Sequence, residues 1–97
     1  MERIPILLCG GSKGRAVVFG WVTRMPAGGE DAVLHDARQV LYWAVECGGL
    51  LGLAAKGPAG DTRITGTVPL VIDTEWRQAV QCTAAAAEGI VAWPAQQ

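Results

Sequence analysis

RIPILLCGGSKGRAVVFGWVT, residues 3–23, is the stretch that decides the fold. Two apolar runs, residues 3–9 and 15–23, flank a five-residue segment that contains three glycines. β-branched and aromatic side chains dominate the second run and favour a strand, while the glycines permit a tight turn. The stretch therefore predicts a β-hairpin. Because Pro5 cannot donate to a ladder, the first run is predicted as an edge strand, or as a strand whose first residues lie outside the ladder.

The segment that follows the hairpin has an ambiguous pattern. MPAGGED, residues 25–31, predicts a turn, and AVLHD after it predicts a third strand. Residues 36–46 then carry apolar side chains at helical spacing, yet they include VLYWAV, a β-favouring run of strand length. We favour a turn of helix near residues 36–39, followed by a strand through Tyr42 and Trp43. The alternative assignment of this segment stays open.

The last third of the chain predicts two helices and further strands. Residues 50–58 predict a short helix, residues 62–73 one or two strands interrupted near Gly66, and residues 76–82 a strand. A C-terminal helix begins after Thr83 as N-cap and is expected to pack through Ala87, Ile90 and Val91. The sequence thus predicts one α+β domain over residues 1–97, a mainly antiparallel β-sheet or small barrel-like sheet with short helices and a C-terminal helix.

Composition indicates which kinds of partner this chain can have. Hydrophobic residues make up 51% and charged residues 18%, against about 25% charged in an ordinary soluble domain. A small domain with so few charges is expected to bury apolar surface in a homo-oligomer. A net charge of −1 argues against binding to extended nucleic acid or to a membrane surface. Three cysteines without a C-x-x-C pair predict neither a disulfide framework nor a metal site, and we expect no cofactor.

Two glycine-rich loops raise the question of anion binding. GGSKGR has serine and lysine in the wrong order for a phosphate-binding P-loop and leads into a strand. A weaker anion site than a P-loop is still possible in chemical terms, with backbone N–H groups as donors and Lys13 and Arg15 as the positive charges beside them. Lys56, Gly57 and Arg63 repeat the combination in the second loop. Plain turn formation is the favoured explanation of both loops, and an anion site is the alternative.

Aromatic side chains form the second candidate constellation. Tyr42 and Trp43, with Arg38 nearby, offer a surface on which a base stacks, whereas large aromatic residues of a small domain also serve as core or subunit interface. Catalytic patterns are sparse, because His35 is the single histidine and Ser12 the single serine. A hydrolase built on His35 and one of the cysteines is therefore a minor alternative.

Several motifs in order resemble a known family. These are DAR at residues 36–38, LYW at 41–43, GLLGLAAKGP at 49–58, TRI at 62–64 and AVQCTAAAAEGIVAW at 79–93. Together they resemble an uncharacterised small domain found in bacteriophage and prophage genomes. The resemblance implies a phage origin and carries no activity. Action in the host cytoplasm is the corresponding expectation, since the apolar run after Arg3 is too short for a signal peptide or a membrane span.

These observations favour a non-enzymatic, homo-oligomeric phage accessory protein. Its ligand is expected to be host-derived, either a defence protein or a small anionic signal such as a nucleotide, which the protein sequesters. A structural virion or assembly component is the alternative. The candidate ligand-binding residues are Lys13, Arg15, Arg38, Tyr42, Trp43, Lys56, Gly57 and Arg63.

Overall fold

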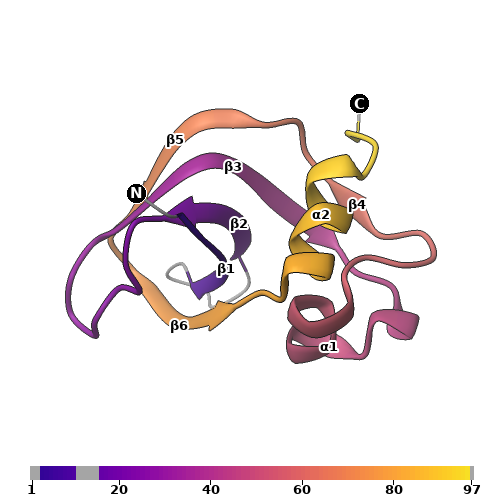
Figure 1. Cartoon of the computed structure of the whole chain (residues 1–97), viewed down its shortest axis with the longest axis horizontal. Helices are drawn as coiled ribbons and strands as arrows, with labels where there is room; N and C mark the ends of the chain where they lie inside the picture. The colour runs from indigo at the N-terminus through magenta and orange to yellow at the C-terminus, as the bar shows by residue number, and fades with distance from the viewer. Residues whose placement is uncertain (1–2, 11–15, 97) are drawn as a thin grey trace.

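A computed structural model of the chain describes residues 3–10 and 16–96. The elements follow in the order β1 (Ile4–Gly10), β2 (Ala16–Val22), β3 (Ala32–Tyr42), a 3-10 turn η1 (Val45–Cys47), α1 (Gly49–Lys56), β4 (Arg63–Ile64), β5 (Val68–Asp73), β6 (Trp76–Gln81) and α2 (Ala84–Ala92) (Figure 1). The predicted α+β class is confirmed: a mainly antiparallel sheet carries two short helices, one of them C-terminal. Among the described residues, no helix is long and apolar enough to cross a membrane.

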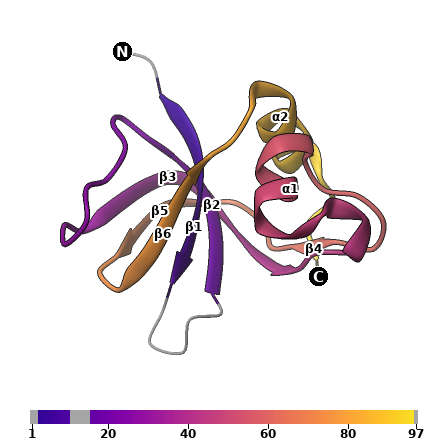
Figure 2. The same ribbon diagram turned by 90° about the horizontal axis from the view of Figure 1, so that it is seen from below.

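The described strands form one six-stranded sheet with the order β4-β3-β2-β1-β6. β5 pairs with the N-terminal half of β3, residues 32–37, whereas β4 pairs with its C-terminal end at Val40 and Tyr42. The sheet curls, and both helices lie to one side of it (Figure 2). β5 and β6 are consecutive in the chain, yet their described residues do not pair with each other. The sheet is consequently not closed into a barrel.

The predicted hairpin is confirmed, but its first strand is not an edge. β1 pairs with β2 along its whole length, from Ile4 opposite Val22 to Gly10 opposite Ala16, and it also pairs with β6. Pro5 is tolerated in this interior strand because the ladder with β6 begins one residue later, at Ile6. The Pro5 carbonyl still accepts a hydrogen bond from the Cys82 amide. The prediction that the first residues lie outside a ladder therefore holds on the β6 side.

The predicted turn of helix at residues 36–39 is wrong, because β3 runs unbroken from Ala32 to Tyr42. Two pairings show one extra residue in this strand: Phe19 lies opposite Arg38, but Trp21 lies opposite His35. Asp36, at φ 48°, is the residue with left-handed backbone in this bulge. Apolar residues recur at helical spacing in this segment because both faces of the sheet are covered. Ala37 and Val40 are buried on opposite faces rather than on one side of a helix.

Two apolar clusters hold the sheet. The first lies between the sheet and the helices and includes Leu7, Phe19, Val40, Leu53 and Ile90. The second lies within the curl of the sheet and is formed by Ile6, Leu8, Val22, Ala32, Leu34 and Ala37. A strand buried on both faces reads as a continuous apolar run, which is why ILLC in β1 lacks alternation.

Both predicted helices are present, and glycine brings them together. Gly57 ends α1 with φ 90°, and a Cβ at this position would lie 3.3 Å from the Cα of Ala86 in α2. Thr83 is the N-cap of α2, because its hydroxyl accepts a hydrogen bond from the Ala86 amide at 3.1 Å. Ala87 and Ile90 are buried as predicted, but the prediction for Val91 is wrong, since it is 54% exposed. Val91 instead borders a cleft.

Candidate binding cleft

A cleft of about 560 Å³ lies between α2 and the outer surface of strands β1 and β2. Its lining is mainly apolar and comes from segments that are far apart in the sequence. The apolar lining residues include Pro5, Trp21, Cys82, Ala87 and Val91. Arg3 and Glu88 are the charged residues that border it. The cleft forms because the chain passes from β6 at Gln81 into α2 at Ala84, which places the first turns of the helix beside the ends of β1 and β2 (Figure 1).

Trp21 is the large aromatic side chain of this cleft. Trp21 lies two residues after Phe19 in β2, so both rings lie on the face of the sheet that packs against the helices. Their ring centroids are 5.8 Å apart at an interplanar angle of 81°, an edge-to-face contact that fixes the orientation of Trp21. Phe19 is fully buried, whereas Trp21 is partly exposed. One ring thus belongs to the core, and the next one is partly exposed in the cleft.

Arg3 and Asp36 extend the site toward the sheet. The Arg3 guanidinium lies 5.7 Å from the centroid of the Trp21 ring, and its Nη2 donates to Oδ2 of Asp36 at 2.9 Å. Asp36 is the bulge residue of β3 and reaches Arg3 from there. A second depression of about 390 Å³, which includes Thr23, His35 and Pro69, shares Arg3 with the cleft. Arg3 therefore separates two hollows on one face of the sheet.

Cys82 supplies a neutral apolar wall. It is buried, and burial raises the pKa of its thiol to about 12 from an ordinary value of 9.0. The thiol consequently stays protonated at neutral pH, a state that suits packing and not nucleophilic attack. Cys47 is also buried, and its sulfur lies 3.3 Å from the Thr62 hydroxyl. In the described part of the chain, no group of three or more His, Cys, Asp and Glu residues is placed to hold a metal ion.

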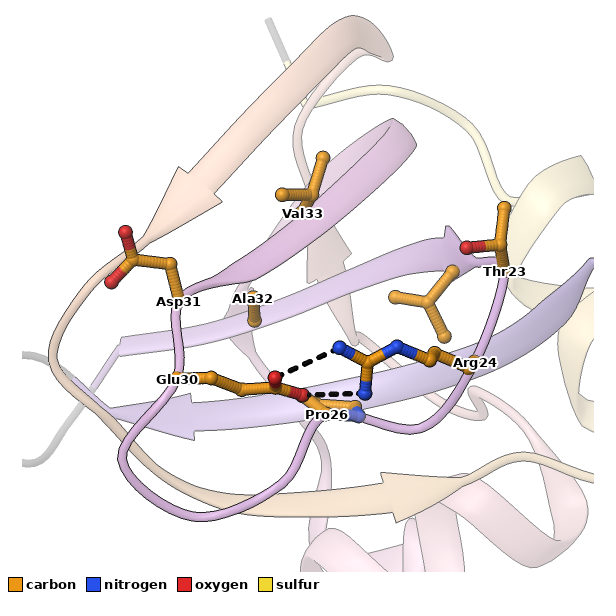
Figure 3. A pocket seen from close by; sticks show the side chains of 8 residues that line it. Thr23, Arg24, Pro26, Glu30, Asp31, Ala32 and Val33 are labelled. Atoms are coloured by element: carbon orange, nitrogen blue, oxygen red, sulfur yellow. Dashed lines mark hydrogen bonds and ion pairs between the residues drawn. The ribbon is translucent and has the colours of Figure 1, made fainter.

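A smaller pocket of about 140 Å³ lies beside the β2–β3 connection (Figure 3). Arg24 donates through both terminal nitrogens to Glu30, each at 2.9 Å. The Ala27 amide also donates to Glu30, at 2.6 Å. Hydrogen bonds from Arg24 and Ala27 lower the pKa of the Glu30 carboxyl. Because these polar groups already satisfy one another across the pocket, its geometry indicates a closed loop rather than a ligand site.

Arg38, one of the two predicted site residues in β3, points into the fold. Its side chain is 4% exposed, and its Nε donates to the Thr65 carbonyl at 2.7 Å. One terminal nitrogen donates to the carbonyls of Ile90 and Val91, in the last turn of α2. A guanidinium at a helix C-terminus satisfies carbonyls that lack a partner within the helix. Burial lowers the pKa of the Arg38 guanidinium below its ordinary value.

The other predicted residues lie elsewhere. Lys13 and Arg15 fall outside the described residues. Tyr42 and Arg63 are cross-strand neighbours, both exposed, whereas Trp43 packs partly against the first cluster.

Lys56 and Gly57 end α1, and the loop after them is closed by its own hydrogen bonds. The Gly57 amide donates to the Leu53 carbonyl and the Thr62 amide to the Ala59 carbonyl. The Thr62 hydroxyl also donates to the Ala59 carbonyl, at 2.6 Å. These two amides are therefore not available to an anion.

The sequence did not indicate Arg3, Cys82 or Glu88 as neighbours of Trp21. Trp21 was not among the candidate binding residues, although it lies in the β-favouring run of residues 15–23, and Asp36 belongs to the DAR motif. The cleft brings Trp21 together with Cys82 and Glu88, which follow it by more than 60 positions in the chain, and no local spacing carries that information.

The family assignment agrees with the extent of this fold. The family described as a domain of unknown function, DUF6948, matches residues 5–90. The chain belongs to this family. The DUF6948 match covers β1 from its second residue, β2 to β6 and most of α2. It therefore includes the buried residues of both clusters and all of the cleft lining except Arg3 and Val91. No curated protein and no solved structure matches the chain.

Proposed function

We propose that this DUF6948 protein is a non-enzymatic binding protein whose cleft beside α2 receives part of a partner molecule. The observation that carries the proposal is the combination of an apolar cleft of about 560 Å³ with a partly exposed tryptophan and a charged border. Binding sites are typically concave and apolar, with a few polar groups that set orientation. Trp21 supplies contact area in a fixed orientation, because its edge-to-face contact with Phe19 holds the ring.

The charges at the cleft favour a protein partner over a nucleotide. Asp36 and Glu88 are acidic, and Arg3 is already paired with Asp36. A phosphate group entering here would meet more negative than positive charge. Sequestration of a nucleotide is the second candidate, and one observation favours it elsewhere on the surface: Tyr42 and Arg63 lie opposite each other on β3 and β4, a stacking ring beside a guanidinium.

Self-association forms part of the proposal. Val33, Leu70 and Ile72 are 43%, 48% and 56% exposed, and Val33 pairs directly with Ile72 across the β3–β5 ladder. Directly opposed residues share one face of a sheet, so these side chains form a continuous apolar surface, which we call the β5 face. Such a surface on a domain with few charges supports a homo-oligomer. A structural assembly component would use the same face.

The resemblance to phage domains supplies the proposed setting. A phage accessory protein acts in the cytoplasm of the host cell, and its partner there is a host protein. The proposal assigns this partner to the cleft and a second copy of the chain to the β5 face, so each has a separate surface.

Fragment screening by NMR tests the proposed function. Small apolar fragments and, separately, linear and cyclic nucleotides are added to labelled protein while backbone and indole signals are followed. We expect fragments to shift the signals of Trp21, Ala87 and Val91. Nucleotide-induced shifts at Tyr42 and Arg63, with no fragment response at the cleft, would favour the second candidate and contradict the first.

A further inference from the structure

We propose that the cleft recognises a basic peptide segment, in which a large apolar side chain enters beside Trp21 and an adjacent lysine or arginine pairs with Glu88. This inference rests on the proposed function and names the chemistry of the partner. It assigns Glu88 as the residue that selects the charge of the ligand, and Trp21 as the residue that supplies the contact area.

The chain itself shows how this surface accommodates a cation. Arg3 places its guanidinium over the Trp21 ring, at 5.7 Å, and pairs with Asp36 at 2.9 Å. Aromatic faces attract cations through their quadrupole, and a carboxylate adds a directed hydrogen bond. A second carboxylate, that of Glu88 in α2, lines the cleft together with this same Trp21 ring.

Glu88 differs from Asp36 in having no cation beside it. Within residues 3–10 and 16–96, its carboxylate makes no hydrogen bond or ion pair, and the residue is exposed. The border of the cleft thus carries one balanced pair, Arg3 with Asp36, and one unbalanced negative charge. A ligand with a positive charge near an apolar group complements this border, whereas an acidic ligand is repelled.

The interior of the cleft accounts for the apolar part of the ligand. Pro5, Cys82, Ala87 and Val91 offer no ionised group, because burial keeps the Cys82 thiol protonated. Val91 is 54% exposed, so an entering leucine or phenylalanine side chain would remove apolar surface from water on both molecules. Apolar contact provides affinity in this arrangement, and Glu88 provides the preference for a basic neighbour.

NMR titration with two matched peptides tests the inference. The probes are acetyl-Leu-Arg-Leu-amide and acetyl-Leu-Glu-Leu-amide, which differ only in the charge of the central residue. We expect both to shift the Trp21 indole signal and the arginine peptide to bind about fivefold more tightly, because an exposed ion pair contributes up to about 1 kcal/mol. In Glu88→Gln the ratio of the two affinities falls to about one. Glu75→Gln, in the exposed β5–β6 turn, is the matched control and keeps the fivefold ratio.

Any one of four results would overturn the inference. Equal affinities of the unaltered protein for the two peptides would show that Glu88 does not select a basic ligand. If the peptides still shifted the signals of the cleft, the proposed function would stand. Peptide-induced shifts confined to the β5 face, or no shift with either peptide or with the apolar fragments, would overturn the inference and the proposed function together. If the chemical shift of the Trp21 indole changes with protein concentration when no peptide is present, a second copy of the chain occupies the cleft.

Discussion

The two halves of β3 share one strand but meet different surroundings. On the face that carries Arg38 and Val40, the C-terminal half is covered by α2 and the first apolar cluster. On the same side, the N-terminal half presents Val33 and His35 to the surface, next to Ile72 and Leu70 of β5. The bulge at Asp36 separates the halves and places a carboxylate at the border. The cleft lies where the helical cover ends.

This difference shows how one sheet provides both a core and an exposed apolar surface. Where α2 covers the strand, even a buried guanidinium is tolerated, because helix carbonyls accept its hydrogen bonds. Where no helix covers it, the apolar side chains of the β5 face stay exposed and are available to another molecule. The DAR motif therefore has a structural meaning in this fold: Asp36 pairs with Arg3, Ala37 fills the second cluster, and Arg38 holds the end of α2.

The largest effect is expected when the attachment of α2 to the covered half is removed. Arg38→Met deprives the carbonyls of Thr65, Ile90 and Val91 of their donor while keeping an apolar stem. Unfolding in urea should show a loss of about 2–3 kcal/mol, the cost of leaving buried polar groups unpaired. Arg24→Met is the matched control, because its bonds to Glu30 lie at the surface, and it should leave the urea midpoint unchanged. Equal midpoints for the two variants would refute a structural role for Arg38.

A smaller loss is expected from the start of the same helix. Thr83→Ala removes the N-cap bond to the Ala86 amide and the bond from the hydroxyl to the Ala55 carbonyl. The free energy of unfolding should fall by about 1 kcal/mol. Thr67→Ala, between β4 and β5, serves as control and should behave as the unaltered protein. A stability unchanged by Thr83→Ala would show that packing alone holds α2.

The next effect is confined to alkaline pH. The Cys82 thiol titrates near 9.0 when exposed but at about 12 in the fold, where burial disfavours the thiolate. Protonation of this thiol therefore stabilises the fold fully below pH 9, and the contribution is lost as the pH rises toward 12. Thermal unfolding between pH 8 and 10.5 should show a steeper decline for the unaltered protein than for Cys82→Ala. Parallel pH profiles would contradict the buried state of Cys82.

The smallest effect on stability is expected in the open half. Ile72→Glu places a charge on the exposed β5 face, so the free energy of unfolding of the single chain should change by less than about 0.5 kcal/mol. Sedimentation velocity should nevertheless show a smaller species than the unaltered protein forms. Val45→Glu, at an 87% exposed position in η1, controls for the added charge. Unchanged sedimentation in Ile72→Glu would exclude the β5 face as the contact between copies.

Local patterns predicted most elements and few of the site residues. Two neighbouring β-favouring runs predicted the pairing of β1 with β2, and Thr83 predicted the start of α2, because strand propensity and helix caps depend on nearby residues. The strand assignment failed at Asp36 because a bulge shifts the alternation of side chains, and burial on both faces imitates a helical period. Tyr42 was selected as an aromatic side chain and Arg63 as a charge beside the second glycine-rich loop, and the two become neighbours through the β3–β4 ladder. The contacts of Arg3, Trp21 and Glu88 with the cleft had no local signal.

The sequence by itself determined the α+β class, the hairpin, both helices and the shortage of charge, since these follow from side-chain type and short-range spacing. Only the tertiary structure decided which arginine is buried, which apolar side chains stay exposed, and that α2 lies beside Trp21. Those outcomes depend on the curl of the sheet and on the path of the chain from β6 into α2, which bring together residues that are distant in sequence. Long-range pairing chooses between core and surface for side chains of the same kind.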